Sequence, residues 1–324
     1  MSNFLIGLLG ALLALSSSAA VTNAVAKKPH AVAPVAASND PVEQAYEKLL
    51  EDDDAAQTEV DKWIREHDAF AEKGAGGVAD AALQLRIEQR FEPVHKAYKE
   101  FIERHLKHTQ ARLAYGSFLN DIGKEAEAKE HWDKALALDP KDPAAWNNLA
   151  NYYGHRGPIT NAFIHYQKAI ELSPNEPVYY QNFATTVYLF RRDAMEFFKI
   201  DEPQVFNRAL ELYRKALKLD PNNFALATDF AQSYYGIKPL RYVDAMAAWN
   251  DALKIANDDL TRQGVYLHFA RLQLNTGRFN EARTNLNFVT HAQLQVLKDR
   301  LARNIVEKEK KTNAVGGAAS KLEK

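Results

Sequence analysis

Apolar residues between positions 143 and 174 recur at helical spacing and predict two helices joined by a turn. Four of them share one face of the first helix, at i, i+3, i+4 and i+7: Trp146, Leu149, Ala150 and Tyr153. Asp142 can accept hydrogen bonds from the first turn. Pro143 loses nothing there, because the first N–H groups of a helix have no partner within it. These features predict a helix start at Pro143.

The second helix follows a break at Gly154, Gly157 and Pro158 and stops before the proline at position 174. Its apolar face consists of four residues: Ala162, Tyr166, Ala169 and Ile170. Small side chains on the two facing sides let the backbones approach closely, and the aromatic rings fill the space around them.

The spacing of the second helix recurs as a small residue, a large residue four positions later and a small residue three positions after that. The best copies are Ala128/Trp132/Ala135, Ala162/Tyr166/Ala169, Ala209/Tyr213/Ala216 and Ala245/Trp249/Ala252, with a further copy at Ala282/Leu286/Val289 and a degenerate one at Val94/Tyr98/Phe101. Successive copies begin 34 residues apart in two steps, 36 and 37 apart in two others, and 47 apart in one.

A 34-residue helix–turn–helix period resembles the tetratricopeptide repeat (TPR) family. The family pattern W-x2-L-G-x2-Y…A-x3-F…P is matched by Trp146, Leu149, Ala150, Tyr153, Ala162, Tyr166 and Pro174. Two weaker copies are Tyr115, Gly116, Leu119, Ala128, Trp132, Ala135 and Pro140, and then Tyr180, Phe183, Ala184, Ala209, Tyr213, Ala216 and Pro221. The resemblance implies an all-α, right-handed solenoid of about five to six repeats with capping helices at both ends.

Composition divides the chain into six expected parts. They are a signal peptide at 1–26, an Ala/Pro linker at 27–39, an N-terminal helical cap at 40–74, the repeat array at 75–290, a C-terminal capping helix at 291–310 and a disordered tail at 311–324. The 47-residue step indicates an insertion near 188–206.

The N-terminal apolar run, residues 4–15, is followed by serines and by Ala24-Val25-Ala26, which has the form of a signal-peptidase site. No Lys or Arg precedes the run, so only the α-amino group supplies positive charge. We expect an exported chain, periplasmic or secreted. The alternative is a membrane anchor formed by residues 4–26, although polar residues dilute the second half of that segment below the apolar length that a span requires.

Charge and cysteine content exclude several partners and chemistries. The 324 residues include 41 basic and 42 acidic side chains, for a formal net charge of −1. This balance gives no electrostatic reason to expect a nucleic-acid partner. The absence of cysteine excludes disulfides, thiolate catalysis and Cys-based zinc sites. Contact with a membrane is expected only through an uncleaved N-terminus.

No residue pattern predicts catalysis, a cofactor or a metal. The Gly-rich stretch at 74–77 lacks the Lys-Ser/Thr pair of a phosphate-binding loop. His105 and His108, near Glu103, have a spacing suited to a weak metal site, but no third ligand follows at a defined spacing. The simpler interpretation of these residues is a solvated helix end. We therefore expect a protein that is not an enzyme.

The resemblance implies that one side of the first helix of each repeat, the opening helix, lines a concave groove. The candidate groove residues are Asn120, Asn147, Asn151, Gln181, Thr185, Tyr188, Gln232, Tyr235 and Arg271. Amides carry both donors and acceptors and can bind the main chain of an extended peptide. The alternative is that they are ordinary solvated residues. The basic clamp by which some family members hold carboxylate tails is not matched, because Asn, Gln and Thr stand at 147, 181 and 185.

The expected insertion contains aromatic and basic residues, among them Arg191, Arg192, Phe197 and Phe198. One interpretation is that lengthened helices pack these aromatic rings against each other. The other is an exposed lobe that contacts a partner.

We expect a non-catalytic scaffold or adaptor that binds a peptide segment or a protein in the groove, in the cell envelope. Two alternatives remain open. One is a structural repeat protein that associates with itself, and the other is a metal-dependent or accessory enzyme component.

Overall fold

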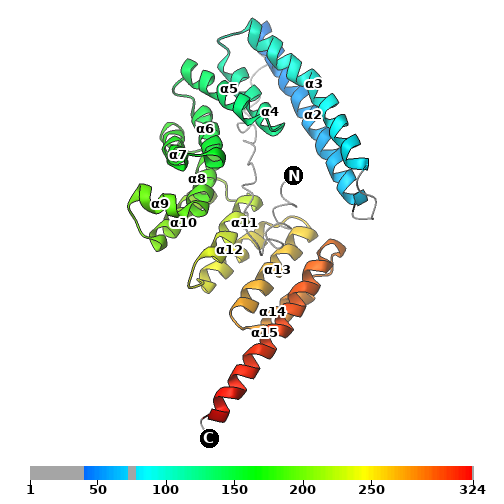
Figure 1. Ribbon diagram of the computed structural model, residues 1–324, viewed down its shortest axis with the longest axis vertical. Helices are drawn as coiled ribbons and strands as arrows, with labels where there is room; N and C mark the ends of the chain where they lie inside the picture. The colour runs from blue at the N-terminus through cyan, green and yellow to red at the C-terminus, as the bar shows by residue number, and fades with distance from the viewer. Residues whose placement is uncertain (1–39, 72–77, 323–324) are drawn as a thin grey trace. The chain divides into compact units, whose positions relative to one another are not determined.

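The computed structural model describes residues 40–71 and 78–322, and its regular structure over these residues is entirely helical (Figure 1). The predicted signal peptide, the linker and the glycine stretch at 74–77 lie outside the described residues. The all-α repeat fold expected from the sequence is confirmed for the described part of the chain.

The α-helices follow one another as α2 (Pro41–Ala71), α3 (Val78–Arg104), α4 (Thr109–Asp121), α5 (Glu125–Leu138), α6 (Pro143–Arg156), α7 (Ile159–Leu172), α8 (Pro177–Leu189), α9 (Arg191–Phe198), α10 (Glu202–Leu219), α11 (Phe224–Ser233), α12 (Tyr242–Ile255), α13 (Asp259–Asn275), α14 (Phe279–Asn287) and α15 (Gln295–Leu322). Short 3₁₀ turns occur at η1 (Tyr234–Gly236) and η2 (Ala292–Leu294). The chain divides within α8 into two compact units, which meet in sequence between Asn182 and Phe183.

Unit 1 contains three helical hairpins, α2–α3, α4–α5 and α6–α7, followed by the first part of α8. The sequence predicted that residues 40–74 form a helical cap. They form one continuous helix as far as Ala71, with Leu49, Val60 and Trp63 buried. Asp40 begins it by accepting a hydrogen bond from the Val42 N–H over 2.9 Å.

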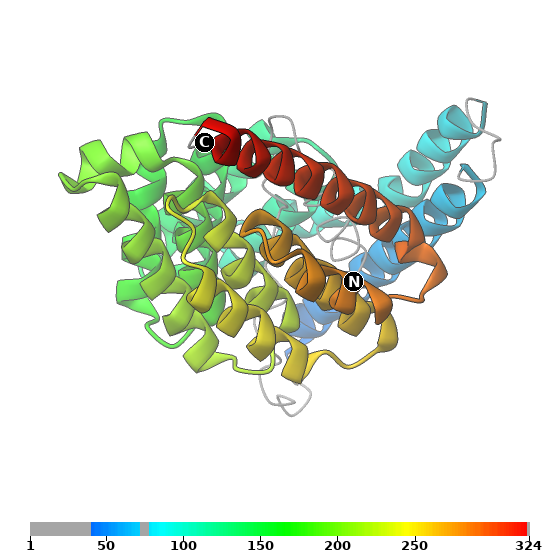
Figure 2. The same cartoon turned by 90° about the horizontal axis from the view of Figure 1, so that it is seen from below.

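In unit 2, each helix from α9 to α14 packs against its neighbour in the sequence. The last helix, α15, covers α13 and α14. Figure 2 shows α15, in orange to red, beside these two helices. Lys308 of α15 donates to the carbonyl oxygens of Leu274 and Asn275 over 3.1 and 3.2 Å. Its positive charge therefore lies at the C-terminus of α13, the negative end of the helix dipole.

The helix α15 continues to Leu322 and therefore passes through most of the segment 311–324, for which the sequence predicted a disordered tail. The difference has a physical reason. Alanine and lysine on both sides of Gly316 and Gly317 favour the helix, and no proline interrupts it within these residues.

The second helix of each repeat, which we call the closing helix, carries the alternating small and large residues. These residues form the core between neighbouring helices. The alanines at the small positions of the four best copies are all at most 1% exposed. The large residues between them, Trp132, Tyr166, Tyr213 and Trp249, are at most 3% exposed. Since alanine adds only a methyl group, the helices approach closely and the aromatic rings occupy the remaining volume.

Candidate peptide-binding surface

Asp142 fixes the start of α6 and ties it to the preceding repeat. Its Oδ1 accepts from the backbone N–H groups of Ala144 and Ala145 over 2.8 and 3.2 Å. Its Oδ2 accepts from Gln110 Nε2 at 3.0 Å, at the start of α4. One carboxylate therefore caps a helix and sets the register between two successive opening helices.

A chain of side-chain amides connects the opening helices of unit 1. Asn182 Nδ2 donates to Asn147 Oδ1 over 3.1 Å, and Asn147 Nδ2 donates to Asn148 Oδ1 over 3.4 Å. Asn148 Nδ2 lies 3.5 Å from Ser117 Oγ, which donates to the Leu113 carbonyl oxygen. We name this set of hydrogen bonds the amide ladder. It crosses from α8 through α6 to α4.

The amide ladder is internal to unit 1. The exposed fractions of Asn147, Asn148 and Asn182 are 1%, 6% and 8%. Asn147 is a candidate groove residue, but its amide oxygen accepts from Asn182 of the next repeat and its amide nitrogen donates to the adjacent Asn148. Sequence analysis missed Asn148 and Asn182. The signal was a second polar position directly after the first, occupied in later repeats by Asp229 and His268.

Asn151, one turn after Asn147, has a different environment. It is half-buried, and its Oδ1 accepts from the hydroxyl of Tyr166 on α7 over 2.6 Å. Within the described residues its Nδ2 has no hydrogen-bond partner. An oriented amide with unsatisfied donors at the surface is suited to bind an oxygen acceptor from a ligand.

Thr185 and Tyr188 lie on the part of α8 that belongs to unit 2. Thr185 Oγ1 lies 2.8 Å from the hydroxyl of Tyr213 on α10. The Tyr188 ring packs against Phe206, with 5.9 Å between ring centroids, and its hydroxyl reaches Gly236. Arg191 donates to the Tyr188 carbonyl oxygen over 3.1 Å. Both candidate residues are therefore held by neighbouring helices.

Tyr235 and Arg271 belong to an aromatic cluster at the end of α11. The Arg271 guanidinium lies 4.4 Å from the Tyr235 ring centroid, and the Tyr235 hydroxyl lies 3.0 Å from His268 Nδ1. His268 is fully buried and stacks on Trp249, with 3.8 Å between ring centroids. Burial, reinforced by the positive charge of Arg271, lowers the pKa of His268 to about 3, so this imidazole stays neutral.

The remaining candidates, Asn120, Gln181 and Gln232, are half-buried on α4, α8 and α11. The structure thus gives every candidate except Asn147 a partly accessible side chain.

The histidines considered as a weak metal site serve the helix junction between α3 and α4. His108 Nδ1 accepts from the Ala111 N–H over 3.0 Å and so caps α4. The ring centroid of His105 lies 4.6 Å from that of Phe101. In the described part of the chain, no three His, Asp or Glu side chains gather where they could hold a metal.

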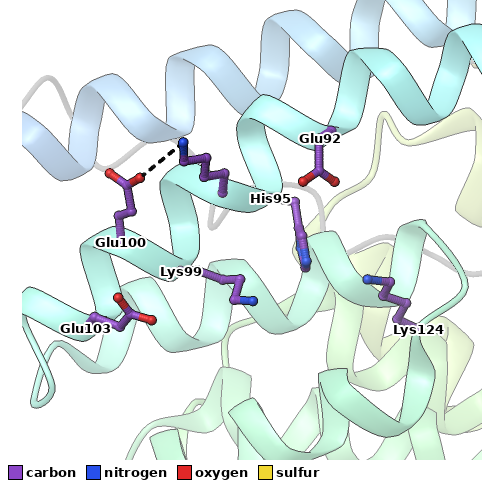
Figure 3. A pocket seen from close by; sticks show the side chains of 7 residues that line it. Glu92, His95, Lys99, Glu100, Glu103 and Lys124 are labelled. Atoms are coloured by element: carbon purple, nitrogen blue, oxygen red, sulfur yellow. Dashed lines mark ion pairs between the residues drawn. The ribbon is translucent and has the colours of Figure 1, made fainter.

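A shallow pocket on α3 carries charges of both signs (Figure 3). Its lining is Glu92, His95, Lys96, Lys99, Glu100, Glu103 and Lys124. Lys96 pairs with Glu100 over 3.8 Å. Burial and, to a smaller degree, Lys124 lower the pKa of His95, whose Nδ1 lies 3.1 Å from the Tyr115 hydroxyl. With three lysines and three glutamates, the pocket favours neither an anionic nor a cationic ligand. We assign no ligand to it.

Helix α9 occupies the segment where the sequence predicted an insertion. Phe197 and Phe198 meet edge to face at 4.8 Å between ring centroids, and the Arg208 guanidinium lies 4.0 Å from the Phe198 ring. Phe198 also lies 6.3 Å from Phe183. These contacts favour the interpretation in which the aromatic rings pack against each other.

Comparison with known families identifies the repeat. Tetratricopeptide repeat models match residues 109–152 and 143–176. The chain contains tetratricopeptide repeats. The matched segments comprise α4 to α7, which are two uninterrupted helix pairs. The next pair, α8 and α10, is separated by α9. Arrays of such repeats are interaction scaffolds in general, since stacking creates extended binding surfaces.

Several solved structures are similar to this chain. A monomeric mutant of IFIT1, solved with m7Gppp-AAAA, is 14% identical over 67% of this chain and 50% of its own, with a TM-score of 0.51. YrrB, described as a TPR protein with an unusual peptide-binding site, is 15% identical over 66% and 99%, with a TM-score of 0.48. PilF of Pseudomonas aeruginosa is 17% identical over 80% and 99%, also at 0.48. No curated protein matches the sequence significantly.

Proposed function

We propose that this protein is a non-catalytic scaffold or adaptor that binds an extended segment of another protein along its opening helices. The observation that carries the proposal is the hydrogen bonding of the Asn151 side chain. Its amide oxygen is occupied by Tyr166 at 2.6 Å, while its Nδ2 has no partner among the described residues. A donor held in one orientation on the polar side of a repeat helix is suited to a peptide carbonyl oxygen.

The proposed contact residues, which we name the binding face of each unit, are the partly accessible candidates: Asn120, Asn151 and Gln181 in unit 1, and Thr185, Tyr188, Gln232, Tyr235 and Arg271 in unit 2. Amides and hydroxyls pair with the main chain without selecting side chains. Tyr188 and Tyr235 add apolar area with a polar tip, as at many interfaces. Asn147 contributes indirectly, because it holds α6 against α8 through the amide ladder.

The proposal includes export. Its support is the apolar run at 4–15 and the Ala24-Val25-Ala26 sequence, which lie outside the described residues. Within residues 40–71 and 78–322, every helix is too short or too polar to span a bilayer.

The test is selection of peptides from a random phage-displayed library against the chain from Lys27 onward. Binding of the synthesised peptides is then compared with that of an Asn151→Ala/Gln181→Ala/Gln232→Ala variant. The matched control is Gln167→Ala/Asn250→Ala, which removes exposed amides from α7 and α12. Helical content and melting temperature of all three proteins are compared first.

We expect the triple variant to weaken binding at least tenfold and the control to leave it unchanged. Equal binding by all three proteins would show that the binding face is assigned wrongly. Failure to select any peptide, together with concentration-dependent dimerisation in sedimentation, would favour the self-associating structural protein instead.

A further inference from the structure

The closing helices supply a second set of residues for ligand recognition. We propose that the hydroxyls of Tyr166 and Tyr213 are positioning groups that fix Asn151 and Thr185, and that at Asn151 this selects an oxygen acceptor, a peptide carbonyl or carboxylate. The inference rests on the proposed function. It adds the residues that decide whether the site presents hydrogen-bond donors or acceptors to the ligand.

The first observation is the geometry at Asn151. Tyr166 is 2% exposed, so its ring is locked in the core and its hydroxyl has a defined position. That hydroxyl donates to Asn151 Oδ1 over 2.6 Å. An amide whose oxygen is engaged on one side directs its two N–H groups to the other side. Asn151 therefore offers donors to a ligand, and the complementary ligand atom is an acceptor.

The second observation is that the following repeat has the same arrangement. Tyr213 occupies the position equivalent to Tyr166, is 3% exposed, and places its hydroxyl 2.8 Å from Thr185 Oγ1. Burial, reinforced by the nearby Asp229, raises the pKa of Tyr213 above its usual value. This hydroxyl therefore stays protonated at physiological pH, and either oxygen of the pair is able to donate the hydrogen bond.

Tryptophan at the equivalent position makes different contacts. The Trp132 indole N–H donates to the Leu113 carbonyl oxygen over 3.3 Å. Trp249 stacks on His268, with 12° between the ring planes. Tyr166 and Tyr213 thus form a hydrogen bond with the polar residue at equivalent positions of the opening helix, Asn151 and Thr185. The sequence shows the difference directly, as Tyr or Trp between two alanines.

Orientation in advance changes affinity because a side chain that is already fixed loses less rotational freedom when the ligand binds. Removal of a single hydroxyl lets Asn151 rotate and present its oxygen. We expect a loss of about 5- to 10-fold in affinity for a peptide that uses a carbonyl or carboxylate at this position, the size of one ordinary hydrogen bond.

The experiment compares Tyr166→Phe with Tyr152→Phe. Tyr152 is half-buried on α6 next to Asn151, and its hydroxyl has no hydrogen-bond partner among the described residues. The first measurement is the Asn151 side-chain amide signal in NMR spectra of the free protein, assigned with Asn151→Asp. The second is the affinity for a phage-selected peptide, synthesised with a free or an amidated C-terminus to separate a terminal carboxylate from main-chain carbonyls.

We expect Tyr166→Phe to shift and average the two Asn151 N–H signals and to weaken peptide binding, while Tyr152→Phe changes neither. Asn151 signals that are the same in parent and Tyr166→Phe would overturn the positioning role. Altered signals with unchanged affinity would overturn the ligand assignment. If the parent binds no peptide, the proposed function and the ligand assignment fail together, and the NMR comparison still decides the role of Tyr166.

Discussion

Asn182 on α8 donates its side-chain N–H to the side-chain oxygen of Asn147 on α6 over 3.1 Å. Because both amides are buried, this bond is the central link of the amide ladder. Asn147→Ala removes the acceptor of the Asn182 side-chain N–H and the donor to the Asn148 side-chain oxygen. We expect a loss of about 1–3 kcal/mol in unfolding free energy. Exposed Asn250→Ala is expected to stay within about 0.5 kcal/mol of the parent. Urea unfolding followed by circular dichroism measures both, and equal values would contradict an internal role for the ladder.

Gly116 and Trp132 are in direct contact, so position 116 has no room for a side chain. A Cβ at Gly116 would lie 2.6 Å from Trp132 Cδ1. Gly116→Ala should therefore destabilise unit 1 by about 1–3 kcal/mol, despite the better helix propensity of alanine. The melting temperature of Gly116→Ala/Trp132→Phe tests the cause. If the clash is responsible, the double variant loses less than the sum of the two single variants.

Asp142 makes two kinds of contact, and two substitutions separate them. Asp142→Asn keeps the cap on α6, and its new N–H donates to the side-chain oxygen of Gln110 once the Gln110 amide turns over, while Asp142→Ala removes both contacts. We expect alanine to cost about 1–2 kcal/mol and asparagine clearly less. Thermal unfolding by calorimetry provides the measurement. Equal losses in the two variants would indicate that the negative charge, rather than the hydrogen bonds, stabilises this junction.

His268 predicts a dependence of stability on pH. Its pKa is about 3 in the folded chain and 6.5 as the ordinary value, so the unfolded chain binds more protons below pH 6.5. The contribution of neutral His268 is fully present above pH 6.5 and is lost on acidification toward pH 3, at up to about 1.4 kcal/mol per pH unit. His268→Phe keeps a ring against Trp249 and removes the titration. Between pH 7.5 and 5 the parent should lose up to about 2 kcal/mol more than this variant in urea unfolding. Parallel pH profiles would contradict the assignment.

Export makes a prediction about the mature N-terminus. Cleavage after Ala24-Val25-Ala26 gives a chain that begins at Lys27. The full-length gene product is expressed in a bacterial host, and the N-terminal sequence of the product in the periplasmic fraction is determined. Recovery of the uncleaved chain in the membrane fraction would support the anchor at 4–26.

Repeat spacing was enough to predict the fold. Amphipathic periodicity identified α6 and α7, and the alanine–aromatic–alanine pattern identified the buried faces of α5, α7, α10 and α12. These features are local, because helix geometry converts sequence spacing directly into a shared face. The same spacing indicated the insertion now occupied by α9.

The binding face was predicted less completely. Periodicity placed Asn147 and Asn151 on one polar stripe, but their environments differ, since Asn147 is 1% exposed and Asn151 is half-buried. Exposure depends on how closely the next repeat packs, and neither residue's own helix contains that information.

The sequence by itself determined the helices, the repeat period and the buried small residues, because each follows from contacts within a helix or between adjacent helices. Only the tertiary structure decided which amides join the amide ladder, and that Tyr166 and Tyr213 hold Asn151 and Thr185. These hydrogen bonds depend on the distance and rotation between helices that are separated in sequence. A displacement of about 1 Å between the bonded side chains would break them, since a hydrogen bond is lost beyond about 3.5 Å.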